Sequence, residues 1–376
     1  MSDHPVLHWD EAGKACAARW RSAQGLPPPK RVRVIDDTMK ADVAYRLACE
    51  GTALLWSGDF QNARQLLVAM SRRLDRKPPV LNKADGLPAE AFNLHRQNQA
   101  LRARVLNTIL IPLAADYSIP LRRAPEVREA CMEVYGASGE AAVVSLRELS
   151  GLIGAHEWRK KGVEIAVLSE RIYPHYGVYS PVRGEYLALV NSAPLPSVEL
   201  AFDIGTGTGV LAALLARRGI KRVIASETDP RALVCARENL KRLGLDSQVE
   251  VEQTDLFPAG RAPLIVCNPP WIPARPSSPI EYAIYDPNSR MLRGFLGGLA
   301  AHLAPGGEGW LVLSDIAEHL VLRTREELLG WIAAAGLRVL EKLDTKPHHP
   351  KVSDATDPLH AARAAEITSL WRLSAG

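Results

Sequence analysis

Strand-length and helix-length patterns alternate along the second half of this chain, from residue 198 to the end. Seven short apolar runs read as strands: VELAFDIG, RVIASE, QVEVEQTD, LIVCNPP, GWLVLSD, RVLEKLD and EITSLWRL. Between them, apolar residues recur at helical spacing over 209–218, 230–243, 289–303 and 323–335. This alternation predicts a parallel sheet with helices on both faces, which binds ligands beyond the carboxyl ends of its strands.

The first half of the chain has a different, helical periodicity. Apolar residues recur three and four positions apart over 37–76, which reads as a helical hairpin. Further helices are predicted over roughly 88–113, 124–135 and 139–155. The Pro-rich, basic stretch 21–33 reads as a linker, so the first thirty residues are expected to be an extended arm or a short helix.

A change of pattern between the two halves marks the expected domain junction. Short β-rich runs flank a polar turn over 159–181, which predicts a β-hairpin. We therefore expect an all-helical N-terminal domain over 1–156 that recognises the substrate. A β-hairpin and the α/β sheet are expected over 157–376.

Composition places the chain among ordinary globular proteins, with 47% hydrophobic and 23% charged residues. The net charge of +4 allows an RNA partner without indicating one. The five cysteines include no Cys-x-x-Cys pair, so zinc or redox chemistry is not indicated and a reducing cytoplasm is expected. Neither a signal-peptide pattern nor a run of about 18 apolar residues occurs, so we expect no secretion and no membrane span.

The loop after the first strand of the second half, FDIGTGTGV, is rich in glycine. Gly205, Gly207 and Gly209 let the backbone turn sharply and let a ligand approach without a Cβ in the way. The helix that follows offers its N-terminal amides. A dinucleotide-binding fingerprint needs glycine where Val210 stands, so the pattern is instead Asp-x-Gly-x-Gly-x-Gly beginning at Asp203.

Two further acids end the next two strands. Glu227 follows RVIAS beside the glycine loop, where its oxygens can accept both hydroxyls of a ribose. Asp255 can accept from an adenine amino group, and the backbone of Leu256 can meet a ring nitrogen. With Asp203 they form a predicted socket for an adenosine whose 5′ substituent carries an amine and a sulfonium rather than a pyrophosphate. Taken alone, Glu227 can equally be a surface acid.

The fourth strand runs directly into Asn268, Pro269, Pro270 and Trp271. Neither proline can donate a backbone hydrogen bond, and their fixed φ holds the turn rigid. Taken alone, such a segment is most often a rigid turn. Its place at the end of the fourth strand favours a catalytic role.

In this order and spacing, DIGTGTG, ASETDP, QTDLF and NPPW resemble motifs I to IV of the class I S-adenosylmethionine-dependent methyltransferases. The resemblance covers about 157–376. With the hairpin segment before the first motif, the chain is most similar to the glutamine N5-methyltransferases that modify release factors and ribosomal proteins. That family has a helical N-terminal domain, usually shorter than this one, and usually has tyrosine where Trp271 stands.

The resemblance implies a seven-stranded Rossmann-like methyltransferase sheet with its last strand antiparallel. It also implies a set of residues that bind S-adenosyl-L-methionine: Asp203, Gly205, Thr206, Gly207, Gly209, Glu227, Asp255, Leu256 and Asn268. The implied catalytic residues are Asn268, Pro269, Pro270 and Trp271. In the family, the asparagine side-chain carbonyl and the first proline's backbone carbonyl accept the two N–H bonds of the target nitrogen. No metal is required.

The resemblance makes a protein glutamine side chain the leading acceptor. An exocyclic amine of an RNA base, adenine N6 or guanine N2, is the chief alternative. A small-molecule amine, or an adaptor that binds the cofactor without catalysis, are further alternatives. The oligomeric state is not indicated by the sequence.

Two segments outside these motifs carry polar side chains of open function. Asp286, Asn288 and Arg290 either line the acceptor pocket or cap the helix that starts near Ser289. The stretch 346–363 gathers three histidines and two aspartates, but their spacing does not put metal ligands on one helix face. A substrate-facing loop is the favoured interpretation of that stretch.

Overall fold

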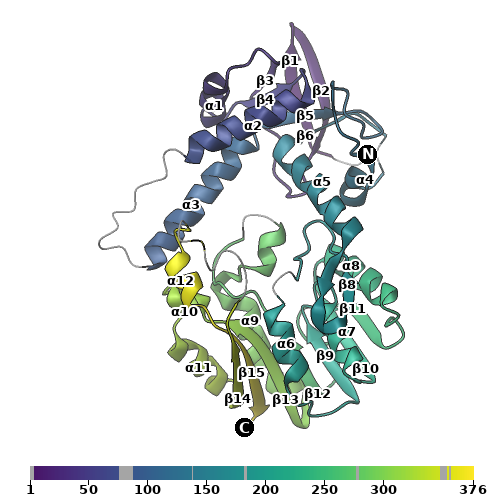
Figure 1. Ribbon diagram of the computed structural model, residues 1–376, viewed down its shortest axis with the longest axis vertical. Helices are drawn as coiled ribbons and strands as arrows, with labels where there is room; N and C mark the ends of the chain where they lie inside the picture. Colours follow the sequence, from purple (N-terminus) through teal and green to yellow (C-terminus); the bar gives the residue numbers. More distant parts are fainter. Residues whose placement is uncertain are drawn as a thin grey trace. The chain divides into compact units, whose positions relative to one another are not determined.

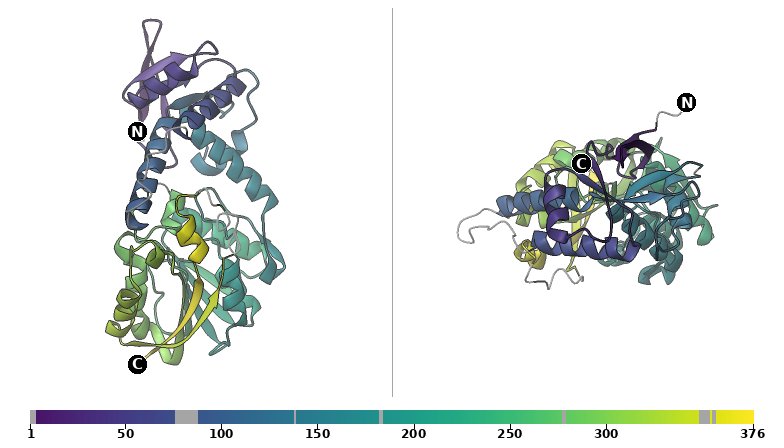
Figure 2. Two further views of the ribbon diagram at one scale, coloured as in Figure 1. Left: turned by 60° about the vertical axis from the view of Figure 1, so that its left-hand side comes forward. Right: turned by 90° about the horizontal axis from the view of Figure 1, so that it is seen from above.

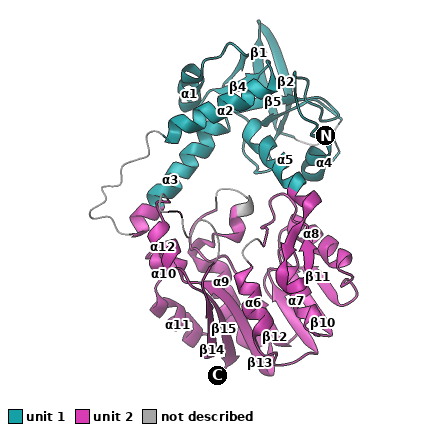
Figure 3. Ribbon diagram, viewed as in Figure 1, with its two compact units in different colours: residues 1–84, 93–157 teal, residues 85–92, 158–376 magenta. Residues whose placement is uncertain are grey.

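A computed structural model of the chain describes residues 4–75, 88–137, 139–181, 184–276, 279–347, 354 and 357–376. The chain divides into two compact units (Figure 3). Unit 1 comprises residues 1–84 and 93–157, and unit 2 comprises 85–92 and 158–376. Within the described ranges, no helix is both long and apolar enough to cross a membrane.

Unit 2 is built on a seven-stranded sheet with the strand order β11-β10-β9-β12-β13-β15-β14. Its strands are β9 (Leu200–Ile204), β10 (Arg222–Glu227), β11 (Val249–Gln253), β12 (Ala262–Cys267), β13 (Leu303–Ser314), β14 (Leu337–Thr345) and β15 (Thr368–Ala375). The strands from β9 to β13 pair in parallel. β15 runs antiparallel to both β13 and β14, and the last two strands are long and twisted (Figure 2). The predicted α/β class is confirmed for this part of the chain.

Helices cover both faces of this sheet (Figure 1). They are α6 (Glu185–Ser192), α7 (Val210–Arg217), α8 (Pro230–Arg242), α9 (Arg290–His302), α10 (Ile316–His319), α11 (Arg325–Ala334) and α12 (His360–Ala365). Successive residues of β9 are buried on opposite faces of the sheet. Ala201 packs with α6 and α7, whereas Phe202 packs with α9 and α11. Because both faces are buried, the strands read as continuous apolar runs.

A β-hairpin precedes the first strand of this sheet, as predicted for 159–181. β7 (Val163–Ile165) and β8 (Glu170–Ile172) pair antiparallel around the short helix η1 (Ala166–Leu168). Ile165 and Ile172 are buried in the same core as α6 and α7. The hairpin therefore packs on that face of unit 2.

Unit 1 contains a six-stranded mixed sheet with the order β1-β2-β6-β5-β4-β3. Its strands are β1 (Val6–Glu11), β2 (Lys14–Arg21), β3 (Val32–Ile35), β4 (Ala53–Trp56), β5 (Ile109–Leu113) and β6 (Ala142–Ser145). The helices in this half of the chain are α1 (Ala41–Cys49), α2 (Phe60–Asp75), α3 (Pro88–Leu106), α4 (Arg128–Tyr135) and α5 (Leu146–Lys161). The first residues of α3 and the last of α5 belong to unit 2.

The prediction of an all-helical domain over 1–156 is therefore wrong. Three strands, β4, β5 and β6, lie inside or beside segments predicted as helical. Every residue of β4 and β6 is buried, so neither strand alternates between apolar and polar residues. Periodicity cannot distinguish an apolar run of four or five residues from part of a buried helix.

The predicted N-terminal arm is also wrong, because β1 and β2 form an antiparallel hairpin there. Glu11 pairs with Lys14, which leaves a two-residue loop of Ala12 and Gly13. Both loop residues have positive φ, 53° and 79°, as a type I′ hairpin turn requires. The sequence feature that indicates this hairpin is the short Glu-Ala-Gly-Lys segment at 11–14, whose glycine suits a tight turn.

A buried ion pair joins β13 to β15 and allows a test of what stabilises unit 2. Arg372 donates from Nε and Nη2 to Glu308 at 2.9 and 2.8 Å, and Trp310 Nε1 donates to the same carboxylate at 2.9 Å. Burial alone would raise the pKa of Glu308, but these hydrogen bonds outweigh it and hold the pKa below 4.5. Folding therefore favours the ionised carboxylate.

We predict that Arg372→Met lowers the free energy of unfolding by about 3 kcal/mol at pH 7, because a buried carboxylate loses its partner. A carboxyl group with a lowered pKa adds stability above its unfolded pKa and loses it as the pH falls through the folded value. The effect of Arg372→Met should therefore shrink as the pH falls below 4.5. Urea unfolding at pH 7 and pH 4 measures both quantities.

Lys221→Met is the matched control, since Lys221 and Glu199 form an ion pair whose side chains are 66% and 65% exposed. It should cost less than about 1 kcal/mol. Equal destabilisation by the two substitutions would contradict the buried-pair interpretation.

Candidate functional site

The predicted site residues of unit 2 gather at one edge of its sheet. Asp203 lies in β9 and Glu227 ends β10, while Asn268 directly follows β12. β9 lies between β10 and β12 and pairs in parallel with both. Because the carboxyl ends of parallel strands meet at the same edge, these side chains are brought together there.

The glycine loop is tied to the end of β10 by backbone hydrogen bonds. The N–H groups of Gly205 and Thr206 donate to the Ser226 carbonyl at 2.9 and 3.0 Å. Gly205, Gly207 and Gly209 have φ of 71°, 58° and 83°, which residues with a Cβ rarely adopt. A Cβ on Gly207 would meet no atom within 4 Å, so the loop faces open space at this glycine.

Asp203 is fully buried beneath this loop. Its Oδ2 accepts from the Thr206 hydroxyl at 2.6 Å and from the Ala212 N–H at 3.0 Å. Burial raises the pKa of Asp203 to about 6, although these two hydrogen bonds act to lower it. Its Oδ1 is buried and finds no hydrogen-bond donor among the described residues. A buried acceptor without a donor is costly, so a ligand's N–H group would stabilise this oxygen.

Glu227 is held by backbone amides rather than lying free on the surface. Its Oε1 accepts from the Thr228 and Asp229 N–H groups at 2.8 and 3.1 Å. Its Oε2 accepts from the Gly207 N–H at 3.0 Å. A carboxylate has about four lone-pair sites and these contacts use three of them, so Oε2 keeps capacity for one ribose hydroxyl.

Asp255 forms an ion pair with Arg290, and the two side chains are 54% and 69% exposed. Such an exposed pair is weak, so the Asp255 carboxylate can exchange partners. The neighbouring Leu256 has a φ of 66°, and its carbonyl accepts from the Ser226 hydroxyl at 2.5 Å. The backbone at Leu256, three positions past the end of β11, is thus tied to β10.

The Asn-Pro-Pro-Trp turn contains a hydrogen bond that sequence reasoning missed. The Trp271 indole N–H donates to Asn268 Oδ1 at 2.9 Å. Asn268 also forms a hydrogen bond with the hydroxyl of Tyr186 in α6, and burial raises the pKa of that hydroxyl. The Asn268 amide is therefore oriented from two sides. No sequence motif points to Tyr186, because it lies in an ordinary amphipathic helix.

Asp286 caps α9, which supports the capping alternative for this segment. Its two oxygens accept from the Met291 and Leu292 N–H groups at 3.0 and 3.1 Å. Met291 itself was not predicted to lie at the site, but its methyl group lies 2.5 Å from where a Cβ on Gly205 would stand. The start of α9 therefore covers part of the glycine loop.

The stretch 346–363 is described only in part, and His348 and His349 lie outside the described residues. Asp357 forms an ion pair with Arg363 at 2.8 Å. Where the chain is described, no three His, Cys, Asp or Glu side chains are placed to hold a metal ion.

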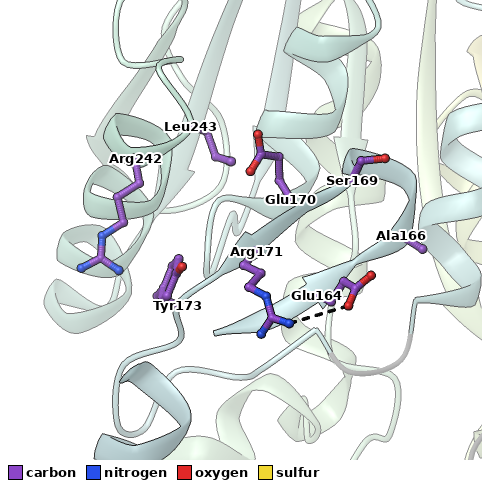
Figure 4. Close-up of a pocket in the computed structure, with 8 residues that line it drawn as sticks. All are labelled: Glu164, Ala166, Ser169, Glu170, Arg171, Tyr173, Arg242 and Leu243. Carbon is purple, nitrogen blue, oxygen red and sulfur yellow. Dashed lines mark ion pairs between the residues drawn. The ribbon is translucent and has the colours of Figure 1, made fainter. Parts of the chain in front are cut away.

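An open pocket of about 710 Å³ lies between the β-hairpin and the end of α8 (Figure 4). Arg171 and Glu164 approach each other there at 3.8 Å, and the Arg242 guanidinium carbon lies 4.4 Å from the centre of the Tyr173 ring. None of the predicted cofactor or catalytic residues lines this pocket.

Residues 177–324 match the family model described as methyltransferase small domain. The chain is 34% identical over 179 residues to the release factor glutamine methyltransferase of Cereibacter sphaeroides, covering 43% of this chain and 62% of the relative. It is 36% identical over 146 residues to the ribosomal protein L11 methyltransferase of Pelotomaculum thermopropionicum, and this match covers 38% of this chain and 39% of the relative. The chain thus spans less than two thirds of the length of these relatives.

The chain also resembles a solved structure of a ribosomal protein L11 methylase from Lactobacillus delbrueckii subsp. bulgaricus, with 18% identity and a TM-score of 0.37. The match covers 55% of this chain and 86% of that protein. The stretch that matches the family model includes β9 to β12 and the loops that follow them. Residues 177–324 are therefore similar to methyltransferase domains.

Proposed function

We propose that this protein is an N-methyltransferase whose leading acceptor is a protein glutamine side chain. One observation carries the proposal: an unpartnered buried carboxylate oxygen of Asp203 and the braced amide of Asn268 lie at the ends of neighbouring strands. The first suits a cationic amine, and the second suits the N–H bonds of an acceptor. A methyl donor and an acceptor nitrogen can therefore meet at this edge.

The residues present fit S-adenosyl-L-methionine. The unpartnered Oδ1 of Asp203 would accept from its amine, and Oε2 of Glu227 would accept from a ribose hydroxyl. Asp255 and the Leu256 backbone would meet the adenine, and the open face of Gly207 would leave room for the ligand. When bound, the cofactor supplies a methyl group on a positively charged sulfonium. The acids at this edge suit a cationic ligand.

Asn268 and Pro269 are the groups proposed to hold the acceptor nitrogen. An amide nitrogen has its lone pair delocalised into the carbonyl, so it needs positioning and polarisation to react. The Asn268 and Pro269 carbonyls would accept its two N–H bonds. Holding reactants in line can contribute up to roughly 7 to 11 kcal/mol over free encounter. The Asn268 oxygen retains a lone pair for the acceptor beside the one used by Trp271.

Trp271 takes a second role in this proposal. Its indole is partly buried and packs against the cores on both faces of the sheet. The indole N–H braces Asn268, while a ring face is the proposed wall for a planar acceptor group. A base or an amide stacked on it would gain on the order of 1 to 3 kcal/mol.

Two relatives support a protein acceptor, since one is a release factor glutamine methyltransferase and the other a ribosomal protein L11 methyltransferase. All five cysteines are unpaired in the structure, which agrees with the proposed cytoplasmic location.

We predict that Asn268→Ala lowers the rate of methyl transfer by about 10² to 10³, because one polarising acceptor of the target nitrogen is lost. Binding of S-adenosylmethionine, measured by calorimetry, should change less than about threefold. Asn191→Ala, at an exposed position of α6, is the control and should leave both quantities unchanged. Full methyl transfer by Asn268→Ala would rule out the proposed role, and an unaffected cellular role for an inactive variant would favour an adaptor.

We predict that S-adenosylmethionine binds more weakly below pH 6, because its amine interacts best with the ionised form of Asp203. The pKa of this carboxyl is about 6, so the group is neutral below that pH in the free protein. The dissociation constant should rise about fivefold between pH 6 and pH 5. Asp203→Asn should bind at least about tenfold more weakly at pH 8 and show a flat profile from pH 5 to 8. A pH-dependent loss of affinity that persists in Asp203→Asn would contradict this assignment.

The acceptor class is tested by labelling a cell extract that lacks this protein. The protein is added with radiolabelled S-adenosylmethionine, and the labelled products are treated with protease or with ribonuclease. We expect label that protease releases and ribonuclease does not. Label lost only to ribonuclease would replace the glutamine proposal by methylation of an RNA base.

A further inference from the structure

Arg21, at the end of β2 in unit 1, is a buried cation with two nitrogens that find no hydrogen-bond acceptor among the described residues. The residue is 7% exposed. Its Nε and Nη2 atoms are buried and have no partner among the described residues, and none of the ion pairs found there includes it. Buried charges are normally paired, so this guanidinium lacks a group that satisfies it.

Two tyrosine rings stack on this guanidinium. Its central carbon lies 5.5 Å from the centre of the Tyr117 ring and 5.5 Å from that of Tyr135. Cation–π contacts of this kind stabilise the positive charge. They supply no lone pair to the N–H groups at the edge of the guanidinium, which still require an acceptor.

The polar neighbours of Arg21 do not provide that acceptor. The buried carboxylate of Glu148 accepts instead from the Tyr135 hydroxyl, the Ala23 N–H at 2.7 Å and the Ser22 hydroxyl at 3.3 Å. The Cys131 thiol is fully buried, and burial raises its pKa to about 12 in spite of the nearby Arg21 charge. The thiol is therefore neutral and supplies no negative charge to pair with Arg21.

We propose that Arg21 and Tyr117 form a binding site in unit 1 for a small oxyanion, either a carboxylate or a phosphate. Nε–H and Nη2–H lie side by side on one edge of the guanidinium, and this pair matches two oxygens of either group. The Tyr117 hydroxyl is a further donor: the residue is 1% exposed and its oxygen has no partner among the described residues. The site lies wholly in unit 1 and is independent of the methyl transfer proposed for unit 2.

The full chain is titrated with sodium phosphate, sodium acetate or sodium chloride at constant ionic strength. Melting temperature reports binding, and calorimetry gives the dissociation constant. We expect a saturable rise in melting temperature with phosphate or with acetate and none with chloride. The anion that binds more tightly identifies the source as a phosphate or a carboxylate ligand.

Arg21→Lys keeps the positive charge but removes the paired N–H groups, so it should weaken binding about tenfold or more. Tyr117→Phe keeps the ring stack and removes only the hydroxyl donor, so it should weaken binding about three- to tenfold. Arg242→Lys is the matched control, because Arg242 is an exposed arginine stacked on Tyr173 in unit 2. It should bind the anion as the unchanged protein does.

The proposal is overturned if neither phosphate nor acetate binds saturably, or if Arg21→Lys binds as tightly as the unchanged protein. If Arg21→Lys fails to fold, Tyr117→Phe decides, and unchanged affinity in that variant overturns the site. In either case Arg21 would serve only as part of an aromatic stack.

Discussion

The parallel pairing of β9 with β10 on one side and β12 on the other is the constraint on which the site depends. Asp203 lies opposite Ala225 in β10 and Val266 in β12. In this register, the turns that follow all three strands leave the sheet at the same edge. The glycine loop is thereby tied to the end of β10, and the Asn-Pro-Pro-Trp turn begins one position past the paired part of β12.

The polar groups at this edge are oriented mainly by backbone and side-chain donors of the protein itself. Both oxygens of Glu227 accept from backbone N–H groups, and one oxygen of Asp203 accepts from Thr206 and Ala212. The Asn268 oxygen is fixed by the Trp271 indole. Because few rotamers satisfy such contacts, a ligand would meet side chains that are already in place, which reduces the entropy lost on binding. The remaining oxygen of Asp203 is the exception, since nothing in the described chain satisfies it.

Unit 1 illustrates how the same rules of patterning fail in a small mixed sheet. β4 is only four residues long and wholly buried, so its sequence Ala-Leu-Leu-Trp has no polar face to reveal a period of two. Its neighbours α1 and α2 have strong helical periodicity, and a helix that spans the gap is the simplest continuation of that pattern. Arg21 shows a second limit of interpreting sequence patterns, because a basic residue beside a Pro-rich stretch is interpreted as part of a solvated linker. In the fold it ends β2 and is buried against two neighbouring tyrosine rings.

The sequence by itself determined the α/β class of the second half, the hairpin before it and the order of the motifs at the strand ends. These features are local: continuous apolar runs, glycines at turns that need positive φ, and prolines that end a strand all act within a few residues. Only the tertiary structure decided which side chains meet. Tyr186 reaches Asn268, and Met291 reaches Gly205, from helices more than eighty residues away in sequence. Such contacts depend on how helices pack on a sheet, and no local pattern encodes that packing.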